Sequence, residues 1–300
     1  MDNLALYSSF IAVVEVGSFT KAAKQLGKTK AIVSRQVIQL EEQLDQRLLS
    51  RTTRSVSVTD QGREVYERLR NIMDDIASLE TYNQSNNPSL SGRLRISAPQ
   101  TFGELKIMPI LSVFMQAHPH LKVELQLNDQ YIDIVQEGFD IAIRVGVLED
   151  SNLIARQISS IRQVLVASPD FLQQYPAITA PEELVNLPCI HDSNRRDGPK
   201  WQFIKEGEHY TTQINPRLRV NGAGAAALAA KQSLGLSISP DFAVQAAIEE
   251  KTLVPVLEDY NIDHVDNVGV YAVYAHRRYT TQKVNVFIDY LLTHLKSVNQ

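Results

Sequence analysis

A cluster of basic side chains near the N-terminus supplies groups that bind phosphate. From Ser18 to Val58 the chain carries eight basic and three acidic residues, a net charge of +5. The whole chain has a net charge of −4, so the remainder carries −9. This asymmetry is expected when one small module meets a polyanion such as DNA and the rest has another task. The basic residues are Lys21, Lys24, Lys28, Lys30, Arg35, Arg47, Arg51 and Arg54.

Three other motifs suggest chemistry but lack the partners that the chemistry needs. Ser18 and Lys21 match S-x-x-K, the nucleophile motif of penicillin-binding enzymes, yet no S-D-N or K-T-G triplet accompanies them. His118 and His120 flank a proline without a nearby cysteine or third metal ligand. "GAGAAALAA" after Asn221 falls short of G-x-G-x-x-G. A helix cap, a polar loop and a tightly packed helix start are the favoured interpretations.

The single cysteine, Cys189, cannot form a disulfide within the chain, which suits a reducing compartment. Its apolar neighbours in "NLPCI" favour a place in the core. A redox-sensor role is the alternative, and it needs an intermolecular partner or a thiol of low pKa.

The composition, 44% hydrophobic and 21% charged, is that of a soluble globular protein, and 300 residues predict two or three units. The N-terminus has an acidic start and an apolar stretch interrupted by Glu15, unlike a signal peptide. No run of 18 apolar residues occurs. We therefore expect a cytoplasmic protein without a membrane partner.

Three short helices are predicted to position the basic cluster, over residues 3–16, 19–26 and 30 to about 44. Ser18 and Thr29 can cap the second and third helices, and Gly27 can supply the left-handed residue between them. In the third helix Val33, Val37, Leu40 and Leu44 share one face. On the opposite side lie Ala31 and Arg35, with Ser34 on the flank.

A short β-hairpin and a long helix follow. Alternation over 55–58 around a Thr/Arg turn predicts the hairpin, and Thr59 can cap the helix. The apolar positions of this helix are spaced as a heptad seam, which indicates a partner helix and hence a dimer. They are Val65, Leu69, Ile72, Ile76 and Leu79. The polar segment 81–92 marks a domain boundary.

From Arg93 onward strands and helices alternate, including a helix around "YIDIVQEG", residues 131–138. Repeated βαβ units predict a mostly parallel sheet with ligands at the carboxyl ends of its strands. Two α/β lobes with a cleft between them are the simplest architecture. Trp201 and Phe203 can line that cleft or belong to a core.

The stretch "GSFTKAAKQLGKTKAIVSRQVIQLEEQLDQRLLSRTTRSVSVTDQG" closely resembles the winged helix-turn-helix signature of LysR-type transcriptional regulators. "SGRLRISAP", "EGFDIAIRVG", "LVASPDFL" and "LGLSISPDF" resemble phrases of that family's effector domain. The resemblance implies an α/β protein overall. An all-α winged helix-turn-helix domain (1–58) and a dimerising linker helix (59–88) precede a two-lobed, periplasmic-binding-protein-like effector domain (91–300). Lobe I would comprise 91–163 and 269–300, and lobe II 164–268, with crossover strands near 161–164 and 268.

The resemblance assigns roles around the turn. Ala23, Gly27 and Val33 take packing and turn positions. The DNA-facing start of the recognition helix would hold Thr29, Lys30, Ala31, Ser34 and Arg35, and the wing would hold Arg51 and Arg54. The sequence departs from the common family phrase "SQPAVSRQ" at Lys30, Ala31 and Ile32. Lysine can donate to guanine but cannot make the two-way pair that glutamine makes with adenine, so base preference differs there.

The resemblance also places effector contacts at Ser97, Pro99, Thr101, Phe102, Asn128, Arg144, Asn221 and Gly222. Thr101 follows the first strand of the lobe and leads into a helix, whose positive end suits an anion. An N-cap role for Thr101 is the alternative, and the two roles are compatible.

These observations predict a DNA-binding transcription regulator modulated by a small-molecule effector bound between the lobes. Expected partners are a pseudo-palindromic double-stranded operator, further copies in a dimer or tetramer, and RNA polymerase. We expect no cofactor, no metal and no enzymatic activity. A solute-binding protein would need a signal peptide and has no use for residues 1–80. An enzyme would need a set of catalytic groups that the sequence does not reveal.

Overall fold

The computed structural model describes residues 3–51, 56–82, 90–130, 133–146, 153–195, 198–262, 268–275 and 281–296. The chain folds into two compact units. The first holds Met1–Arg95 with His118–Glu124 and Ile132–Phe139, and the second holds Ile96–Ala117, Leu125–Tyr131 and Asp140–Gln300. The domain boundaries expected from the sequence stay a prediction.

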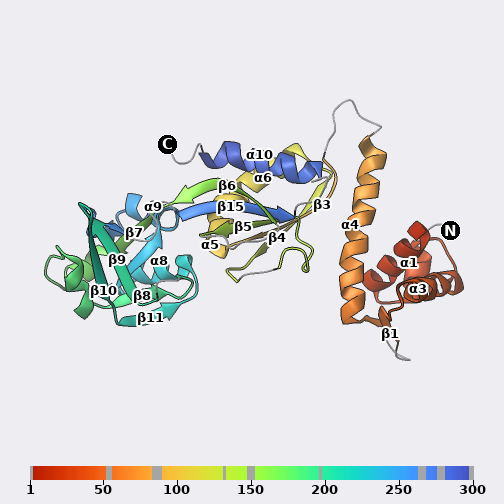
Figure 1. The fold of residues 1–300 in the computed structure, drawn as a ribbon, viewed down its shortest axis with the longest axis horizontal. Helices are drawn as coiled ribbons and strands as arrows, with labels where there is room; N and C mark the ends of the chain where they lie inside the picture. The colour runs from red at the N-terminus through yellow and green to blue at the C-terminus, as the bar shows by residue number, and fades with distance from the viewer. Residues whose placement is uncertain are drawn as a thin grey trace. The chain divides into compact units, whose positions relative to one another are not determined.

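The N-terminal elements are those that the sequence predicts (Figure 1). They are α1 (Asn3–Val16), α2 (Phe19–Gln25), α3 (Lys30–Leu44), the antiparallel hairpin of β1 (Leu49–Arg51) and β2 (Val56–Val58), and α4 (Asp60–Tyr82). Ser18 and Thr29 cap α2 and α3, their hydroxyls accepting from Lys21 N at 3.4 Å and Ile32 N at 3.3 Å. Both caps satisfy N–H groups that a helix leaves unpaired at its start.

The junction between the hairpin and α4 is tightly packed. Thr59 Oγ1 accepts from Gly62 N at 2.9 Å and donates to Arg47 O at 2.8 Å, so the predicted cap is present. A Cβ atom on the buried Gly62 would lie 2.0 Å from Leu48 O. The backbone of Leu48, just before β1, can therefore approach α4 only because residue 62 has no side chain.

Only part of the heptad seam of α4 is exposed, because its first positions pack against the N-terminal core. The expectation that the whole seam needs a partner helix is therefore wrong. Leu69 is 7% exposed and belongs to the N-terminal core, and Val65 packs against that core. Ile72 is 46% exposed and Ile76 is half-buried, whereas the side chain of Leu79 lies outside the described residues. The part of the seam left for another chain begins at Ile72.

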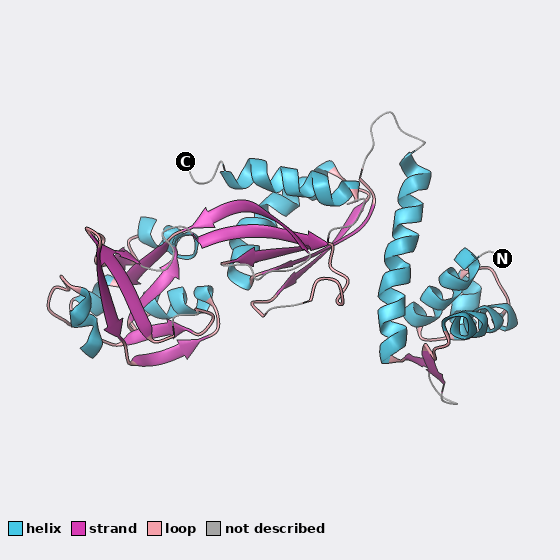
Figure 2. Ribbon diagram, in the orientation of Figure 1, coloured by secondary structure: helices cyan, strands magenta, loops and turns pink. Residues whose placement is uncertain are grey.

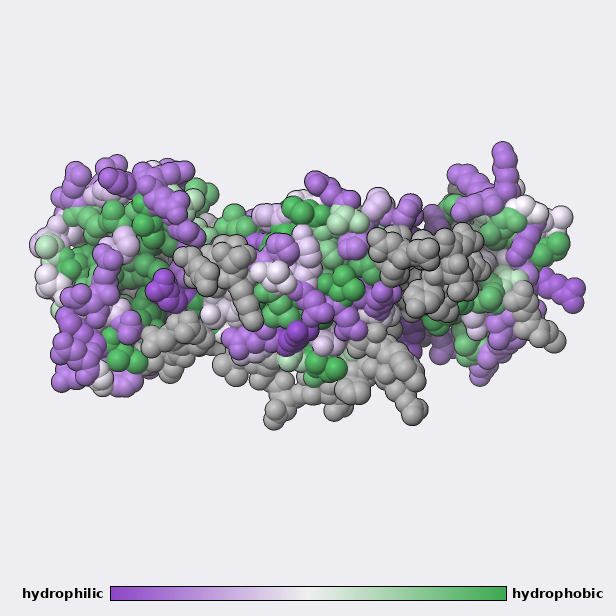
Figure 3. All heavy atoms as spheres, turned by 90° about the horizontal axis from the view of Figure 1, so that it is seen from above, coloured by the Kyte–Doolittle hydropathy of each residue, from purple (hydrophilic) through white to green (hydrophobic). Residues whose placement is uncertain are grey.

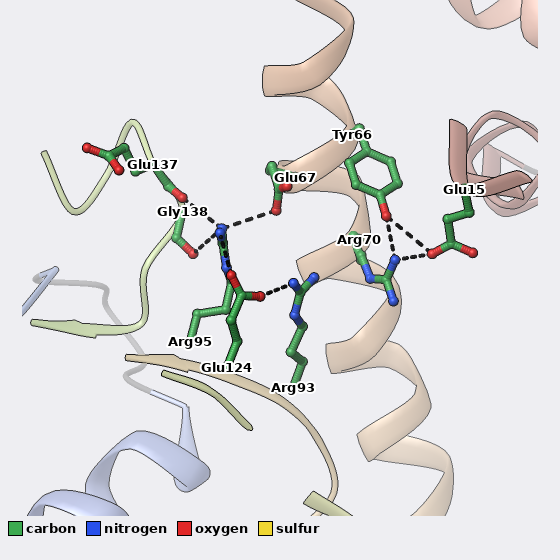
Figure 4. A network of polar contacts seen from close by, with 9 residues as sticks. All are labelled: Glu15, Tyr66, Glu67, Arg70, Arg93, Arg95, Glu124, Glu137 and Gly138. Atoms are coloured by element: carbon green, nitrogen blue, oxygen red, sulfur yellow. Dashed lines mark hydrogen bonds and ion pairs between the residues drawn. The ribbon is translucent and has the colours of Figure 1, made fainter. Parts of the chain in front are cut away.

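Arginine side chains tie α4 to neighbouring segments of the first unit (Figure 4). Arg95, on strand β3 (Gly92–Ala98), donates to Glu137 O at 2.7 Å and Gly138 O at 3.2 Å. The same guanidinium contacts Glu67 Oε2 of α4 at 3.1 Å and Glu124 Oε1 at 3.2 Å. Because only 10% of its side chain is exposed, these partners offset the cost of burying its charge.

A second arginine joins α4 to α1 (Figure 4). Arg70 donates to Glu15 of α1 and to the phenol oxygen of Tyr66, which in turn donates to Glu15 Oε1 at 3.2 Å. The polar contact lies beside the apolar contacts of Leu69, so one face of α4 is fixed to the helix-turn-helix unit by both kinds of interaction.

Lobe I contains a five-stranded sheet of order β4-β3-β5-β15-β6. Its other strands are β4 (Leu121–Leu127), β5 (Ile141–Val145), β6 (Leu153–Ile161) and β15 (Val268–Ala275). The helical segment after β3 comprises α5 (Gln100–Phe102), a π-helical turn η1 (Gly103–Ile107) and α6 (Met108–Ala117). α6 packs against α10 (Gln282–Lys296) through the rings of Phe114 and Phe287, whose centroids are 5.0 Å apart.

Lobe II contains a five-stranded sheet of order β11-β8-β12-β7-β13 and a three-stranded sheet of order β10-β9-β14 (Figure 2). The strands are β7 (Gln163–Ala167), β8 (Cys189–Asp192), β9 (Lys200–Lys205), β10 (Glu208–Gln213), β11 (Pro216–Val220), β12 (Leu236–Pro240), β13 (Val254–Pro255) and β14 (Asn261–Ile262). The helices are α7 (Pro169–Leu172), η2 (Pro181–Asn186), α8 (Ala223–Lys231) and α9 (Asp241–Glu249). Val268 of β15 pairs with Ile161 of β6, where the crossover strands were expected.

Two expectations for the lobes are wrong in detail, and one alternative is decided. Both large sheets are mixed, because β15 runs antiparallel to β5 and β12 runs antiparallel to β7. Residues 133–138 form hydrogen-bonded turns rather than a helix, and residues 131–132 lie outside the described residues. Gly138, at φ +70°, ends this short segment before a helix can develop. Trp201 and Phe203 are 1% and 0% exposed and belong to the core of lobe II.

The visible surface mixes hydrophobic and hydrophilic residues over the whole face shown (Figure 3). Among the residues that the structure describes, no helix combines the length and the apolar character needed to cross a bilayer.

We expect Gly62→Ala to lower the free energy of unfolding of the N-terminal unit by about 1–3 kcal/mol, because the new methyl group overlaps the Leu48 carbonyl. Chemical denaturation followed by circular dichroism measures the change. Gln61→Ala, at an exposed position of the same helical turn, is the control. Equal stability of the two variants would show that the junction relaxes at no cost.

The exposed part of the seam predicts that Ile72→Asp combined with Ile76→Asp disrupts self-association, because a dimer would bury both new charges without partners. Leu69 is left intact, so the N-terminal core keeps its packing. Sedimentation velocity measures the oligomer, and Arg63→Asp, on the exposed opposite side of α4, is the control. A double variant that sediments like the wild type refutes the seam argument.

Candidate functional site

The turn between α2 and α3 has the geometry that the sequence predicts. Gly27 adopts a left-handed conformation, at φ +63°. Its N–H donates to Lys24 O at 3.4 Å, and Lys28 N donates to Ala23 O at 2.9 Å. These two bonds form a Schellman motif, which satisfies the last carbonyls of α2 and turns the chain sharply into α3. Ala23 is 4% exposed beneath the turn.

The two sides of α3 differ as the periodicity predicts, except at Leu44, which was expected on the core side but is 42% exposed at the end of the helix. Val33, Val37 and Leu40 are fully or almost fully buried in the N-terminal core. On the solvent side Lys30, Ala31 and Arg35 are exposed and Ser34 is half-buried, while the capping residue Thr29 is exposed at the start of the helix. The core contacts hold the helix so that small and basic groups face outward at its N-terminal end.

The wing is described only in part. Arg51 ends β1, where it pairs with Val56 of β2, but its side chain lies outside the described residues. Arg54 falls within 52–55, which also lie outside them. The predicted roles of both arginines stay predictions.

In the effector domain, Thr101 joins the two lobes. Its Oγ1 accepts a hydrogen bond of 3.0 Å from the N–H of Gly224, in the first turn of α8. A Cβ atom on Gly224 would lie 3.1 Å from the same oxygen, so the approach is close. The alternative that Thr101 caps its own helix is wrong, because Pro99 stands at the N-cap and no side chain caps α5. Gly224 was not among the effector residues expected from the sequence.

The start of α5 already has a carboxylate partner, which sequence reasoning missed. Asp129 Oδ1 accepts from Gln100 N at 3.0 Å. Its Oδ2 would lie 3.6 Å from a Cβ atom on Gly222, at the start of α8. The predicted Asn128 holds the loop in place, since its N–H donates to Ala98 O and its Oδ1 accepts from Gln130 N. The sequence shows an acidic residue next to Asn128, but it does not show that the side chain of this residue points toward the start of α5.

Other predicted effector residues lie in different environments. Ser97 is fully buried, and Phe102 is 2% exposed with its ring edge-on to Phe242, at 5.2 Å between centroids. Arg144 lies in β5, half-buried, opposite Tyr271. Asn221 is exposed. The structure thus brings Thr101 and Asn128 near the start of α8 that carries Gly222, whereas Ser97 and Phe102 face packed interiors.

The electrostatics near the start of α8 are acidic. Burial raises the pKa of Asp192, the last residue of β8, and the nearby Asp129 raises it further, against hydrogen bonding from Asn194 and the charge of Arg195. Because the carboxyl groups of Asp129 and Asp192 repel each other when both are charged, this place favours a bound group that is positively charged or donates a hydrogen bond. Protonation of one of the two carboxyl groups relieves the same repulsion.

Two features bear on the metal and thiol chemistry that the sequence raised. Among the described residues no group of three His, Cys, Asp or Glu side chains is arranged to hold a metal ion. Cys189 is fully buried, and burial raises the pKa of its thiol to about 12. The core position expected for this cysteine is confirmed, and a low-pKa thiol is contradicted.

Comparison with known proteins agrees with this architecture. Residues 4–63 match the model "Bacterial regulatory helix-turn-helix protein, lysR family", and residues 87–296 match "LysR substrate binding domain". An uncharacterised HTH-type transcriptional regulator of Haemophilus influenzae is 35% identical, over 95% of this chain and 98% of its own length. The HTH-type transcriptional regulator PtxR of Pseudomonas aeruginosa is 32% identical, over 98% of this chain and 93% of its own.

Solved structures give the same result. The full-length Vibrio cholerae virulence activator AphB is 31% identical with a TM-score of 0.62, covering 98% of this chain and 99% of its own. CrgA of Neisseria meningitidis is 29% identical with a TM-score of 0.63, covering 97% and 98%. The helix-turn-helix unit, the two-lobed domain and these matches together show that the chain belongs to the LysR family of DNA-binding transcriptional regulators, whose C-terminal domain binds an effector.

Proposed function

We propose that this regulator reads a pseudo-palindromic operator with the exposed start of α3, and that a small polar molecule bound between its lobes modulates this reading. The hydrogen bond between Thr101 Oγ1 and Gly224 N is the main support for an effector site between the lobes. It joins α5, which follows β3 in lobe I, to the first turn of α8 in lobe II. A ligand that accepts from the N–H of Gly224 must break this bond, whereas the Thr101 hydroxyl still has its hydrogen to donate to a ligand.

For DNA, we assign contacts to Thr29, Lys30, Ala31, Ser34 and Arg35 on α3, and to Arg51 and Arg54 in the wing. The exposure of Lys30 and Arg35 on the side opposite the core supports the assignment. Arginine and lysine are suited to guanine edges and phosphates in the major groove. Lys30 sets the base preference at its position, favouring guanine.

For the effector, an anion remains a candidate but must displace Asp129 from the N–H of Gln100. A ligand with an ammonium or hydroxyl group can instead donate to Asp129 without that displacement. The variant Asp129→Asn distinguishes the two cases. It should strengthen the binding of an anionic effector and weaken the binding of an effector that donates a hydrogen bond to Asp129. A thermal-shift screen of metabolites with both proteins distinguishes them.

Effector binding would alter the relative positions of the lobes and, through paired linker helices, the spacing of two recognition helices. A dimer, or a dimer of dimers, is required because a single short helix reads too few bases for specificity against a genome. The proposal places the protein in the cytoplasm with RNA polymerase as a further partner and assigns it no catalytic role.

Arg35→Ala should reduce operator affinity by about tenfold or more, since a good base-edge contact contributes about 1–3 kcal/mol. The oligomer should be unchanged, because Arg35 is exposed. Fluorescence anisotropy with an operator selected from random-sequence DNA measures the affinity. Arg63→Ala, exposed on α4, is the matched control. Wild-type affinity in Arg35→Ala would remove its assigned role.

Thr101→Val should weaken effector binding and reduce the effector's influence on operator affinity, because valine keeps the volume but cannot bond to Gly224 N or to a ligand. Thr101→Ser, which retains the hydroxyl, is the control and should respond like the wild type. Isothermal titration with a ligand from the screen, followed by anisotropy with and without it, measures both effects. An unaltered response in the valine variant moves the effector site elsewhere.

A further inference from the structure

The side chain of Lys28 points into the helix-turn-helix unit rather than toward solvent. Its Nζ lies 3.1 Å from Gln36 Oε1 and 3.5 Å from Ser9 Oγ. Ser9 Oγ in turn donates to Gln36 Oε1 at 2.7 Å. The three residues come from the turn, from α3 and from α1, so one small polar cluster joins all three segments.

This cluster lies on the inner flank of α3. With an advance of about 100° per residue, Gln36 falls about 60° from Val33, toward the core, and about 100° from Arg35. Gln36 and Lys28 are half-buried, and Ser9 is fully buried among apolar neighbours on α1. A hydroxyl in that position needs a partner, and Gln36 supplies it.

The donors and acceptors of the cluster are matched. The ammonium group donates to Gln36 Oε1 and Ser9 Oγ, and the Ser9 hydroxyl gives its hydrogen to the same Gln36 oxygen. Two donors therefore fix the amide with its oxygen inward. A hydrogen bond from a charged donor in a partly buried place is stronger than one from a neutral donor. The positive charge of Lys28 therefore strengthens the contact to Gln36 beyond what packing of its side chain alone would give.

We propose that Lys28 is a positioning residue for the recognition helix and not one of the phosphate-binding cations of the basic cluster. Its ammonium group sets the distance between the turn and α3 through Gln36, and it anchors both to α1 through Ser9. Lys24 and Lys30, two exposed cations near the turn, are free to meet phosphate instead. The inference concerns how the helix is presented, and it does not depend on which effector the protein binds.

The two roles predict different responses to salt and to DNA sequence. A lysine that neutralises a phosphate contributes about 0.9 to the slope of log K against log [salt] and does so on any sequence. A lysine that positions the helix affects recognition of the operator but leaves that slope and the affinity for unrelated DNA unchanged. The test compares Lys28→Met with Lys24→Met in the full-length protein.

The DNA probes are an operator duplex selected from random-sequence DNA by the wild-type protein and a duplex of the same length and scrambled sequence. We expect Lys28→Met to lower operator affinity by about tenfold at every salt concentration, with scrambled-duplex affinity within about twofold of wild type. Lys24→Met should lower both affinities and reduce the salt slope by about 1.

Companion variants show whether the effect passes through Gln36. Gln36→Leu combined with Lys28→Met should lower operator affinity little more than either change alone, because both changes remove the same interaction. Gln36→Glu keeps an acceptor for both donors and should bind the operator better than Gln36→Leu. Ser9→Ala should weaken operator binding, whereas Ser8→Ala should not, since the Ser8 hydroxyl bonds within α1 to Leu4 O.

Circular dichroism melts confirm that each variant is folded at the assay temperature. If Lys28→Met destabilises the unit, Lys28→Arg, which keeps a donor, should restore both stability and operator preference. The proposal is overturned if Lys28→Met reduces the salt slope by about 0.9 and weakens binding to the scrambled duplex as much as binding to the operator. It is also overturned by additivity of the Lys28 and Gln36 changes, or by wild-type operator affinity in folded Lys28→Met.

Discussion

The packing of α4 against α1 is the constraint on which the N-terminal half of the molecule depends. Leu69 completes the same core that buries Phe10 and Val33, and Arg70 adds a polar contact to Glu15. The first half of α4 is therefore part of the DNA-reading unit. A helix of 23 residues spans about 34 Å, so a small rotation of its far end displaces the recognition helix with it. The position of α4 and the position of α3 are therefore coupled through this one core.

The sequence could predict the elements that depend on local rules. Both N-caps, the glycine turn at Gly27 and the inward face of α3 follow from residue type and spacing over a few positions. The assignment of Leu69 did not follow, because a heptad pattern shows that one side of a helix is apolar but not which surface covers it. The first two positions, Val65 and Leu69, are covered by the helix's own chain, whereas Ile72 is exposed.

The same limit explains what was missed in the lobes and at the candidate effector site. Strand direction depends on long-range connections, and this is why both mixed sheets were predicted as mostly parallel. Thr101 was identified because it follows a strand, but its partner Gly224 is more than a hundred positions away along the chain. Asp129 escaped notice because a charge in a loop looks solvated until the fold turns it toward a helix start.

Arg95 shows how one strand can serve both halves of the regulator. Its buried guanidinium needs partners, and Glu67 of α4 is one of them, together with Glu124 and the carbonyls of residues 137 and 138. Three residues further on, β3 ends at Ala98, and after Pro99 the chain enters α5, which carries Thr101. Arg95, which contacts α4, and Thr101, which joins the lobes, thus lie six positions apart along the chain. Under the proposed function, a ligand that displaces Thr101 would therefore act six positions along the chain from a residue that is bonded to α4.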